Sequence, residues 1–156
     1  MNDADKLAQK VARKMLSDEG TGPAWGLSYD DGGEGWAQVS FRVKADMLNG
    51  HGTIHGGMLF ALADTALAYA CNSRNNRTVA QQASIAFLSP VEMGEKVMAT
   101  AREEALQGRS GVYNVKLTGE DGRTVATFQG LSRAIRGHVI DLSKIPLPKT
   151  KNKKDA

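Results

Sequence analysis

The sequence predicts an α+β fold in which one antiparallel β-sheet of about six strands wraps around a long central helix, with another helix at the N-terminus. Two observations support this architecture. From Met58 to Cys71 only Asp64 and Thr65 are polar, and a helix that is apolar on all sides is a buried helix. Six further segments have the length and patterning of strands, two before this helix and four after it.

The composition is that of a single globular domain. A chain of 156 residues can bury a core, and 41% hydrophobic and 24% charged residues are ordinary for this class. The net charge of +3 comes from a lysine-rich C-terminal tail, so the body is nearly neutral and no nucleic-acid partner is expected. We predict one domain over residues 1–137, with its core at about 25–137, and a partly disordered basic tail over residues 138–156.

The termini and the cysteine content indicate a cytoplasmic protein. Cys71 is the only cysteine, which excludes an internal disulfide framework and a multi-cysteine zinc site. The N-terminal residues are charged, so no signal peptide is expected. The buried helix is shorter than the ~20 apolar residues that cross a bilayer, so we expect no membrane association.

The first elements are a helix and a hairpin. Asp3 to Glu19 has apolar residues at helical spacing; Asp3 or Asp5 could cap it, and Gly20 with Gly22-Pro23 should end it. Trp25 to Asp30 is a candidate strand, followed by a turn over residues 31–35. Residues 35–44 then alternate, with four apolar side chains on one face: Ala37, Val39, Phe41 and Val43.

Four strands are expected after the buried helix, which a polar segment at residues 72–76 should end. Asp121-Gly122 has the sequence of a hairpin turn between the last two strands. The four predicted strands are Thr78–Leu88, Lys96–Leu106, Gly111–Thr118 and Thr124–Arg136. Because one sheet cannot cover such a helix completely, a second subunit should seal its remaining side, and we expect a homodimer.

The start of the buried helix is a candidate oxyanion site. His55-Gly56-Gly57 lies where unpaired backbone N–H groups and the positive end of the helix dipole are expected. A carbonyl bound there would become more electrophilic, and the oxyanion formed on attack would be stabilised. The alternative is that the glycines only permit tight packing at a turn.

Asp64 is the candidate acid–base residue, because an ionised carboxylate in a buried helix is costly unless it is paired, protonated or facing a cavity. It follows Gly56 by eight residues, which is ~12 Å along a helix. One carboxylate cannot act on a carbonyl held that far away, so the spacing predicts a composite site from two antiparallel helices of a dimer. The alternative is a structural carboxylate that caps a loop or pairs with a basic residue.

Other chemistries have weaker support. His51 and His55 are four residues apart, but glycines interrupt the segment and no third ligand is evident, so no metal is expected. Cys71 has no histidine near it in sequence, which argues against a nucleophilic thiol. The serine-nucleophile and phosphate-loop motifs do not occur.

One long motif resembles a known family. The run L-N-G-H-G-T-I-H-G-G over residues 48–57, followed by F-A-L-A-D-T-A over residues 60–66, is similar to the signature of hotdog-fold acyl-CoA thioesterases. The similarity continues through A-Y-A-C-N-S at residues 68–73 and F-L-S-P at residues 87–90. It extends from about Trp25 to Gly137, and within the family it is greatest to the phenylacetic acid degradation branch.

The resemblance implies a hotdog fold and hydrolysis of acyl-CoA thioesters, with phenylacetyl-type and hydroxyphenylacetyl-type acyl groups as the leading class. Asp64 would be the general base or nucleophile, and the Gly56 N–H of the other subunit would polarise the carbonyl. The remaining roles fall to neighbouring residues: His55 and Asn49 orient the carbonyl and its loop, Thr65 helps to hold the water, and Gly57 borders the substrate. No cofactor is implied, because CoA is part of the substrate. Related proteins are commonly tetrameric.

One position departs from the family pattern. Many relatives carry Arg before the proline of F-L-x-P, near the CoA phosphates, whereas this chain has Ser89. Arg109 could supply that charge instead, or it could be an ordinary exposed hairpin arginine. Two other functions remain open: a hotdog dehydratase or hydratase, and a non-catalytic acyl-CoA-binding module that would not need Asp64.

Overall fold

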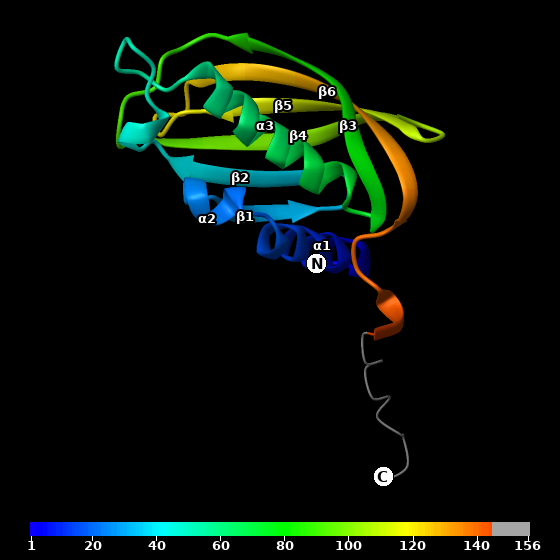
Figure 1. Cartoon of the computed structure of the whole chain (residues 1–156). Helices are drawn as coiled ribbons and strands as arrows, with labels where there is room; N and C mark the ends of the chain where they lie inside the picture. Colours follow the sequence, from blue (N-terminus) through cyan, green and yellow to red (C-terminus); the bar gives the residue numbers. More distant parts are fainter. Residues whose placement is uncertain (145–156) are drawn as a thin grey trace.

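The structure is a computed structural model that describes residues 1–144. It contains three α-helices, two short 3₁₀ helices and six strands (Figure 1). The helices are α1 (Asp3–Asp18), α2 (Thr21–Trp25) and α3 (Gly56–Cys71), with 3₁₀ turns at Ala45–Met47 and Leu142–Lys144. The strands are β1 (Ser28–Gly33), β2 (Trp36–Arg42), β3 (Asn76–Phe87), β4 (Lys96–Gln107), β5 (Ser110–Thr118) and β6 (Thr124–His138).

The six strands form one antiparallel sheet in the order β1-β2-β4-β5-β6-β3. The sheet curves around α3, which lies against its concave face, while α1 packs beside β1 at one edge (Figure 1). β3 forms the other edge and, within residues 1–144, pairs only with β6. The predicted architecture of a sheet around a central helix is therefore confirmed.

The core lies between α3 and the concave face of the sheet. The alternating residues of β2 face it as predicted, and Val39 is completely buried there. Leu62, Ala66 and Leu67 of α3 are also completely buried. Burial of this kind contributes roughly 25 cal/mol per Å² of apolar surface, which makes this interface the main source of stability.

The sheet does not cover all of α3. Phe60 is 37% exposed, and Asp64 and Thr65 are half-buried on the same side of the helix. The rings of Phe60 and Phe128 pack in a T-shaped arrangement, with 5.1 Å between their centroids. One sheet therefore leaves a side of the helix accessible, as its apolar sequence predicted.

Element boundaries differ from the prediction mainly before β2. The N-cap of α1 is Asn2, whose Oδ1 accepts a hydrogen bond from the Asp5 N–H at 2.8 Å, rather than Asp3 or Asp5. The expected terminator at Gly22-Pro23 lies inside α2, because proline fits the first turn of a helix, where its missing N–H has no partner to lose. The strand predicted from Trp25 instead begins at Ser28 and continues to Gly33.

The last strand crosses the boundary predicted at residue 137. His138 pairs with Asn76, and the side chain of Asn75 then makes two hydrogen bonds to the backbone of Ile140, at 2.8 and 2.9 Å. Residues 138–140 are thus attached to the domain. Of the tail over residues 138–156 that was predicted to be partly disordered, residues 145–156 lie outside the described range.

A charged network fixes the C-terminal end of α3 to the sheet. Arg74 forms a bidentate pair with Glu103 of β4, at 2.6 and 3.2 Å, and contacts Glu34 at 2.9 Å. Glu103 also accepts a hydrogen bond from the Tyr113 hydroxyl at 2.9 Å. The network joins the β1–β2 turn, the end of the helix and two central strands.

Candidate active site

The N-terminus of α3 presents a free backbone donor. His55 is the N-cap, and its Nδ1 accepts a hydrogen bond from the Gly57 N–H at 2.8 Å. Within residues 1–144, no acceptor takes the N–H of Gly56, the first residue of the helix. The His55 cap therefore takes the N–H of Gly57 and leaves the N–H of Gly56 available to donate to a ligand oxygen.

Asn49 shapes the loop that leads into the helix. Its Oδ1 accepts from the N–H groups of His51 and Thr53, at 2.9 and 3.3 Å, and its Nδ2 donates to the carbonyl of Ile54 at 3.4 Å. The loop then positions His55, whose N–H donates to the carbonyl of Met47 at 2.8 Å. The side chain of Asn49 thus organises the segment that carries Gly56.

A hollow of about 480 Å³ opens in front of this turn. It is lined on one side by the Asn49 loop and the start of α3, and on the other by Phe87 and the residues that follow β3. The ring of Phe87 packs so closely on Gly56 that a Cβ there would lie 2.9 Å from the ring. The glycine is required by this packing as well as by access to its N–H, so both interpretations of the glycines have a structural basis.

Asp64 lies in a separate cavity of about 700 Å³ between α3, the α1–α2 segment and the ends of β3 and β6. Burial raises the pKa of its carboxyl above the ordinary value. In the described part of the chain no basic side chain pairs with Asp64, so the structural alternative of an ion-paired carboxylate has no support within one subunit. Thr65 lines the same cavity, and its hydroxyl donates to the carbonyl of Ala61 at 2.8 Å.

Tyr69 and Glu19 add polar groups to this cavity that sequence reasoning did not identify. The Tyr69 hydroxyl donates a short hydrogen bond to Glu19, which also accepts from the Thr21 hydroxyl at 2.6 Å. Burial and the Glu19 carboxylate raise the pKa of Tyr69, so its hydroxyl stays protonated. Nothing local in the sequence connects residues 50 positions apart.

Gly56 and Asp64 do not meet within one chain. They line different hollows, and α3 is one continuous helix between them. The eight-residue spacing therefore corresponds to ~12 Å along the axis, as the sequence indicated.

The other candidates lie apart from both hollows. Arg109 is exposed in the turn between β4 and β5, and His51 is exposed in the loop before α3. Cys71 is buried, and desolvation raises the pKa of its thiol to about 12, which disfavours a thiolate nucleophile.

Within residues 1–144 no group of three or more His, Cys, Asp or Glu side chains is arranged to hold a metal ion. No helix in that range is long and apolar enough to cross a membrane.

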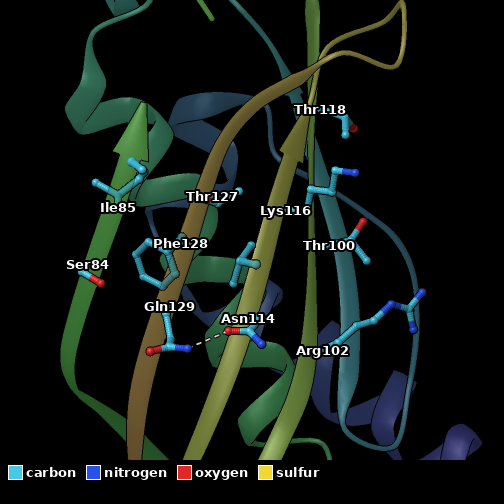
Figure 2. A pocket seen from close by; sticks show the side chains of 12 residues that line it. Ser84, Ile85, Thr100, Arg102, Asn114, Lys116, Thr118, Thr127, Phe128 and Gln129 are labelled. Carbon is cyan, nitrogen blue, oxygen red and sulfur yellow. Dashed lines mark hydrogen bonds between the residues drawn. The ribbon is translucent and has the colours of Figure 1, made fainter. Parts of the chain in front are cut away.

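A further hollow, of about 810 Å³, lies on the face of the sheet opposite α3 (Figure 2). Polar side chains from four strands line it, and Gln129 donates to Asn114 across adjacent strands at 2.9 Å. Its charged groups are Arg102 and Lys116, and Arg102 also lies over the ring of Trp36. Without a carboxylate or histidine in its lining, this surface lacks a general base.

Comparison with known proteins shows the family to which the chain belongs. Residues 51–126 match the thioesterase superfamily. The chain is 41% identical over 132 residues to the acyl-coenzyme A thioesterase PaaI of Escherichia coli K12, covering 85% of this chain and 94% of that protein. It is 34% identical over 97 residues to a putative esterase of Archaeoglobus fulgidus, covering 62% of this chain and 63% of that protein.

Solved structures of related proteins have the same fold. The E. coli PaaI protein from the phenylacetic acid degradation operon superposes with a TM-score of 0.85 and 39% identity, over 87% of this chain and 99% of that chain. A mutant of the phenylacetic acid degradation protein PaaI from Thermus thermophilus superposes with a TM-score of 0.72 and 38% identity, over 75% of this chain and 100% of that chain. Fold and relatives together define a thioester hydrolase with a hotdog fold. The chain belongs to the thioesterase superfamily and is an acyl-CoA thioesterase of the PaaI type.

Proposed function

We propose that the enzyme hydrolyses CoA thioesters of aromatic or ring-derived acids, of the phenylacetyl and hydroxyphenylacetyl type, at two composite sites per dimer. The observation that carries the proposal is Asp64, an unpaired carboxylate with a raised pKa facing a cavity of about 700 Å³. The E. coli relative from a phenylacetic acid degradation operon supports a role in phenylacetate degradation.

The cavity suits a ring-shaped acyl group. Part of its wall is apolar and can contact a desolvated ring: Met15, Trp25, Ala61, Ala68 and Ile135. Charged side chains line the rest, among them Asp18, Glu19 and Arg77. The Tyr69 hydroxyl, held by Glu19, gives the cavity a polar group that can meet a ring hydroxyl.

The free edge of β3 favours a homodimer. The strand has 12 residues, most of them exposed, and Arg77 is its only charged residue. A long edge strand with so little charge and no proline is a template for pairing with another chain unless it is covered. A second copy of the same strand would complete its hydrogen bonds in antiparallel register.

Such a dimer would assemble the two halves of the site. The Asp64 cavity includes Thr78 and Val79 at the start of β3, whereas the Gly56 hollow includes Phe87 and Leu88 at its end. Antiparallel pairing around the middle of β3 brings the start of one strand to the end of the other. The Asp64 cavity of each protomer then lies beside the Gly56 hollow of its partner.

In this arrangement the Gly56 N–H polarises the thioester carbonyl and stabilises the oxyanion, while His55 and Gly57 hold the turn that presents it. Asn49 fixes the loop through its backbone contacts. Asp64 of the other subunit takes a proton from water, or attacks directly, and Thr65 helps to hold the water. The CoA thiolate is a good leaving group, so this mechanism requires no metal and no cofactor beyond the CoA of the substrate.

The face of the sheet opposite α3 remains free in that dimer (Figure 2). We propose it as the surface through which two dimers form a tetramer. Light scattering of the purified protein distinguishes the two assemblies.

The test of the function is the substitution Asp64→Asn, assayed on phenylacetyl-, hydroxybenzoyl- and straight-chain acyl-CoAs. We expect the variant to keep its fold and assembly and to lose most hydrolysis, with the parent fastest on ring-containing acyl groups. Asp18→Asn is the matched control, because Asp18 borders the same cavity but is paired with Lys14 at 2.6 Å.

Hydrolysis by Asp64→Asn at the parent rate would refute the assigned role. Hydration of unsaturated acyl-CoAs would favour a hydratase, and tight acyl-CoA binding without turnover would favour a binding module.

A further inference from the structure

The segment that follows β3 forms one wall of the Gly56 hollow and also supports the wall opposite. Residues 88–90 line the hollow. The next residue, Val91, is completely buried, and its carbonyl accepts a hydrogen bond from the Ile54 N–H at 2.9 Å. Ile54 directly precedes the His55 cap, so the turn that presents the Gly56 N–H is attached to this segment.

The same segment leaves the sheet where the regular pairing of β3 ends. The N–H groups of Leu88 and Ser89 both donate to the carbonyl of Val125, at 2.9 and 3.1 Å. Pro90 has no N–H, so its carbonyl is its one backbone group that can form a hydrogen bond. That carbonyl accepts a hydrogen bond from Nη2 of Arg123 at 2.8 Å.

Two carboxylates hold the guanidinium of Arg123 in a fixed orientation. It forms a bidentate pair with Glu95, at 2.7 and 2.9 Å, and its Nη1 donates to Asp121 at 2.9 Å. A Cβ on Gly119 would lie 2.5 Å from Nη1, so the pair lies directly against the backbone of the β5–β6 turn. The side chains of Arg123 and Glu95 are only 31% and 17% exposed, so the pair is screened less than one on the open surface. The bidentate geometry therefore keeps Nη2 directed at the Pro90 carbonyl.

Two hydrogen bonds thus connect Arg123 to the turn that presents the Gly56 N–H. The first runs from Arg123 to Pro90 and the second from Ile54 to Val91, and the other links between them are covalent. A shift of the segment would move the N–H relative to a bound carbonyl. Displacements of about 1 Å at a reacting group lower rates by up to about 100-fold.

We propose that Arg123 is a positioning residue for thioester hydrolysis and that it holds the Gly56 N–H in place for the oxyanion through the Pro90 carbonyl. This inference rests on the proposed function and concerns a side chain outside the lining of both hollows. Arginine suits the role because its planar fork engages Glu95 and the carbonyl at the same time, whereas a lysine ammonium is a single point charge.

The first test is Arg123→Met, which keeps an unbranched apolar side chain and removes the donors. We expect kcat to fall by roughly 5–20-fold and KM to stay within about twofold of the parent, because an oxyanion donor acts in the transition state. The acid limb of the kcat profile should keep its apparent pKa, since Asp64 is unchanged.

The matched control is Arg42→Met. Arg42 likewise pairs with a carboxylate and donates to a backbone carbonyl, those of Glu120 and Gly94, both at 2.7 Å. Gly94 lies outside the lining of the hollow, so the control should keep the kcat of the parent.

Combination with Gly56→Ala separates positioning from a general loss of stability. Both substitutions displace the same N–H, so Gly56→Ala/Arg123→Met should lose less activity than the product of the two single losses. Arg123→Lys keeps the charge without the fork, and its kcat should lie between those of the parent and Arg123→Met. It replaces the methionine variant if that protein does not fold.

The amide resonance of Gly56 gives a readout that does not depend on hydrolysis. In the whole sequence only Gly52 and Gly56 follow a histidine. Labelling with carbonyl-¹³C histidine and ¹⁵N glycine therefore leaves two amides for detection by NMR, and the one that disappears in Gly56→Ala belongs to Gly56. We expect Arg123→Met to shift this resonance and Arg42→Met to leave it at the parent position.

Four results would each overturn the proposal: the kcat of the parent in Arg123→Met, a rise in KM alone, single losses that multiply fully in the double variant, or an unshifted Gly56 amide. An equal loss of kcat in Arg42→Met would do the same, because it would attribute the effect to this end of the sheet in general. If the parent hydrolyses no thioester but the amide shifts as expected, the proposed function fails and the attachment of the Gly56 turn to Arg123 stands.

Discussion

The ring of Phe87, the last residue of β3, packs against Gly56, the first residue of α3, so that a Cβ on the glycine would lie 2.9 Å from the ring. This contact joins the edge strand to the helix terminus that carries the free N–H. Phe87 is 55% exposed, so its ring also forms part of the surface that a partner strand or a substrate meets. The packing at this one position affects both assembly and carbonyl binding.

The first prediction concerns this contact. In Gly56→Ala the new Cβ must displace the Phe87 ring, which changes the hollow in front of the N–H without removing the donor. We expect kcat to fall by roughly 10–100-fold, because displacements of about 1 Å at a reacting group have effects of this size. Steady-state kinetics measures the fall in kcat, and thermal melting shows whether the fold is kept. Gly50→Ala is the control, since nothing lies within 4 Å of a Cβ at Gly50. Equal loss of activity in both variants would mean that the loop, not the contact with Phe87, is sensitive.

The second prediction follows from the burial of Asp64, which raises the pKa of its carboxyl above 3.8. The folded state therefore binds the proton more tightly than the unfolded state, so the ionised carboxylate opposes folding. Its contribution to stability is most favourable below pH 3.8 and is lost as the pH rises through the folded pKa. Asp64→Asn should thus melt at or above the temperature of the parent at about pH 7, and the difference should shrink as the pH falls toward about 4.

The same shift predicts the pH dependence of hydrolysis. Because the base must be ionised, kcat should rise with pH along an acid limb whose apparent pKa lies above that of an ordinary aspartate. Melting curves and kcat profiles from about pH 4 to about pH 8 test both statements. A variant clearly less stable than the parent at neutral pH would show that Asp64 makes a stabilising ionic contact.

The third prediction concerns the network at the other end of α3. Arg74→Ala leaves Glu103 without its bidentate partner, and we expect a loss of about 1–3 kcal/mol in the free energy of unfolding. Tyr113→Phe removes one hydroxyl bond to the same carboxylate and should cost about 1 kcal/mol. Urea denaturation of both single variants and the double variant measures the coupling between them.

The network should also depend on pH. The hydrogen bond from Arg74 holds the pKa of Glu103 below its usual 4.5. The stabilisation is therefore present above pH 4.5 and is lost as the pH falls through the lower folded pKa. The difference between the parent and Arg74→Ala should narrow in that range, and a difference independent of pH would attribute the loss to packing of the arginine side chain.

Features set by local pattern were predictable from the sequence, and those set by distant contacts were not. The alternation in β2 indicated its buried face because side chains of a strand point to opposite sides in turn. The apolar run of α3 indicated a central helix, and its spacing placed Gly56 and Asp64 too far apart to cooperate. In contrast, α2 was missed because Pro23 was interpreted as a helix end, although proline is also favoured near a helix start.

The contacts that surround the site could be identified only from the folded structure. The contact of Phe87 with Gly56 joins residues 31 positions apart in the numbering, and the pair formed by Glu19 and Tyr69 joins residues 50 apart. Neither separation has a local sequence signal.

The final prediction tests the composite site directly. Asp64→Asn and Gly56→Pro should each inactivate the enzyme, the first by removing the base and the second by removing the N–H and displacing the Phe87 ring. Proline is compatible with the backbone at the first residue of a helix. In a dimer of one chain of each kind, one site carries both lesions and the other carries neither. Random mixing in equal amounts makes about half of the dimers mixed, so about a quarter of the parent activity should return.

The measurement is made after co-expression with two different affinity tags and purification through both, which isolates the mixed dimers and should raise the recovered activity to about half of the parent value. Dimers of two differently tagged Asp64→Asn chains are the control and should stay inactive. If verified mixed dimers of the two variants are also inactive, Asp64 and Gly56 must act within one chain. The ~12 Å between them along α3 would then have to be closed by a change in the helix itself.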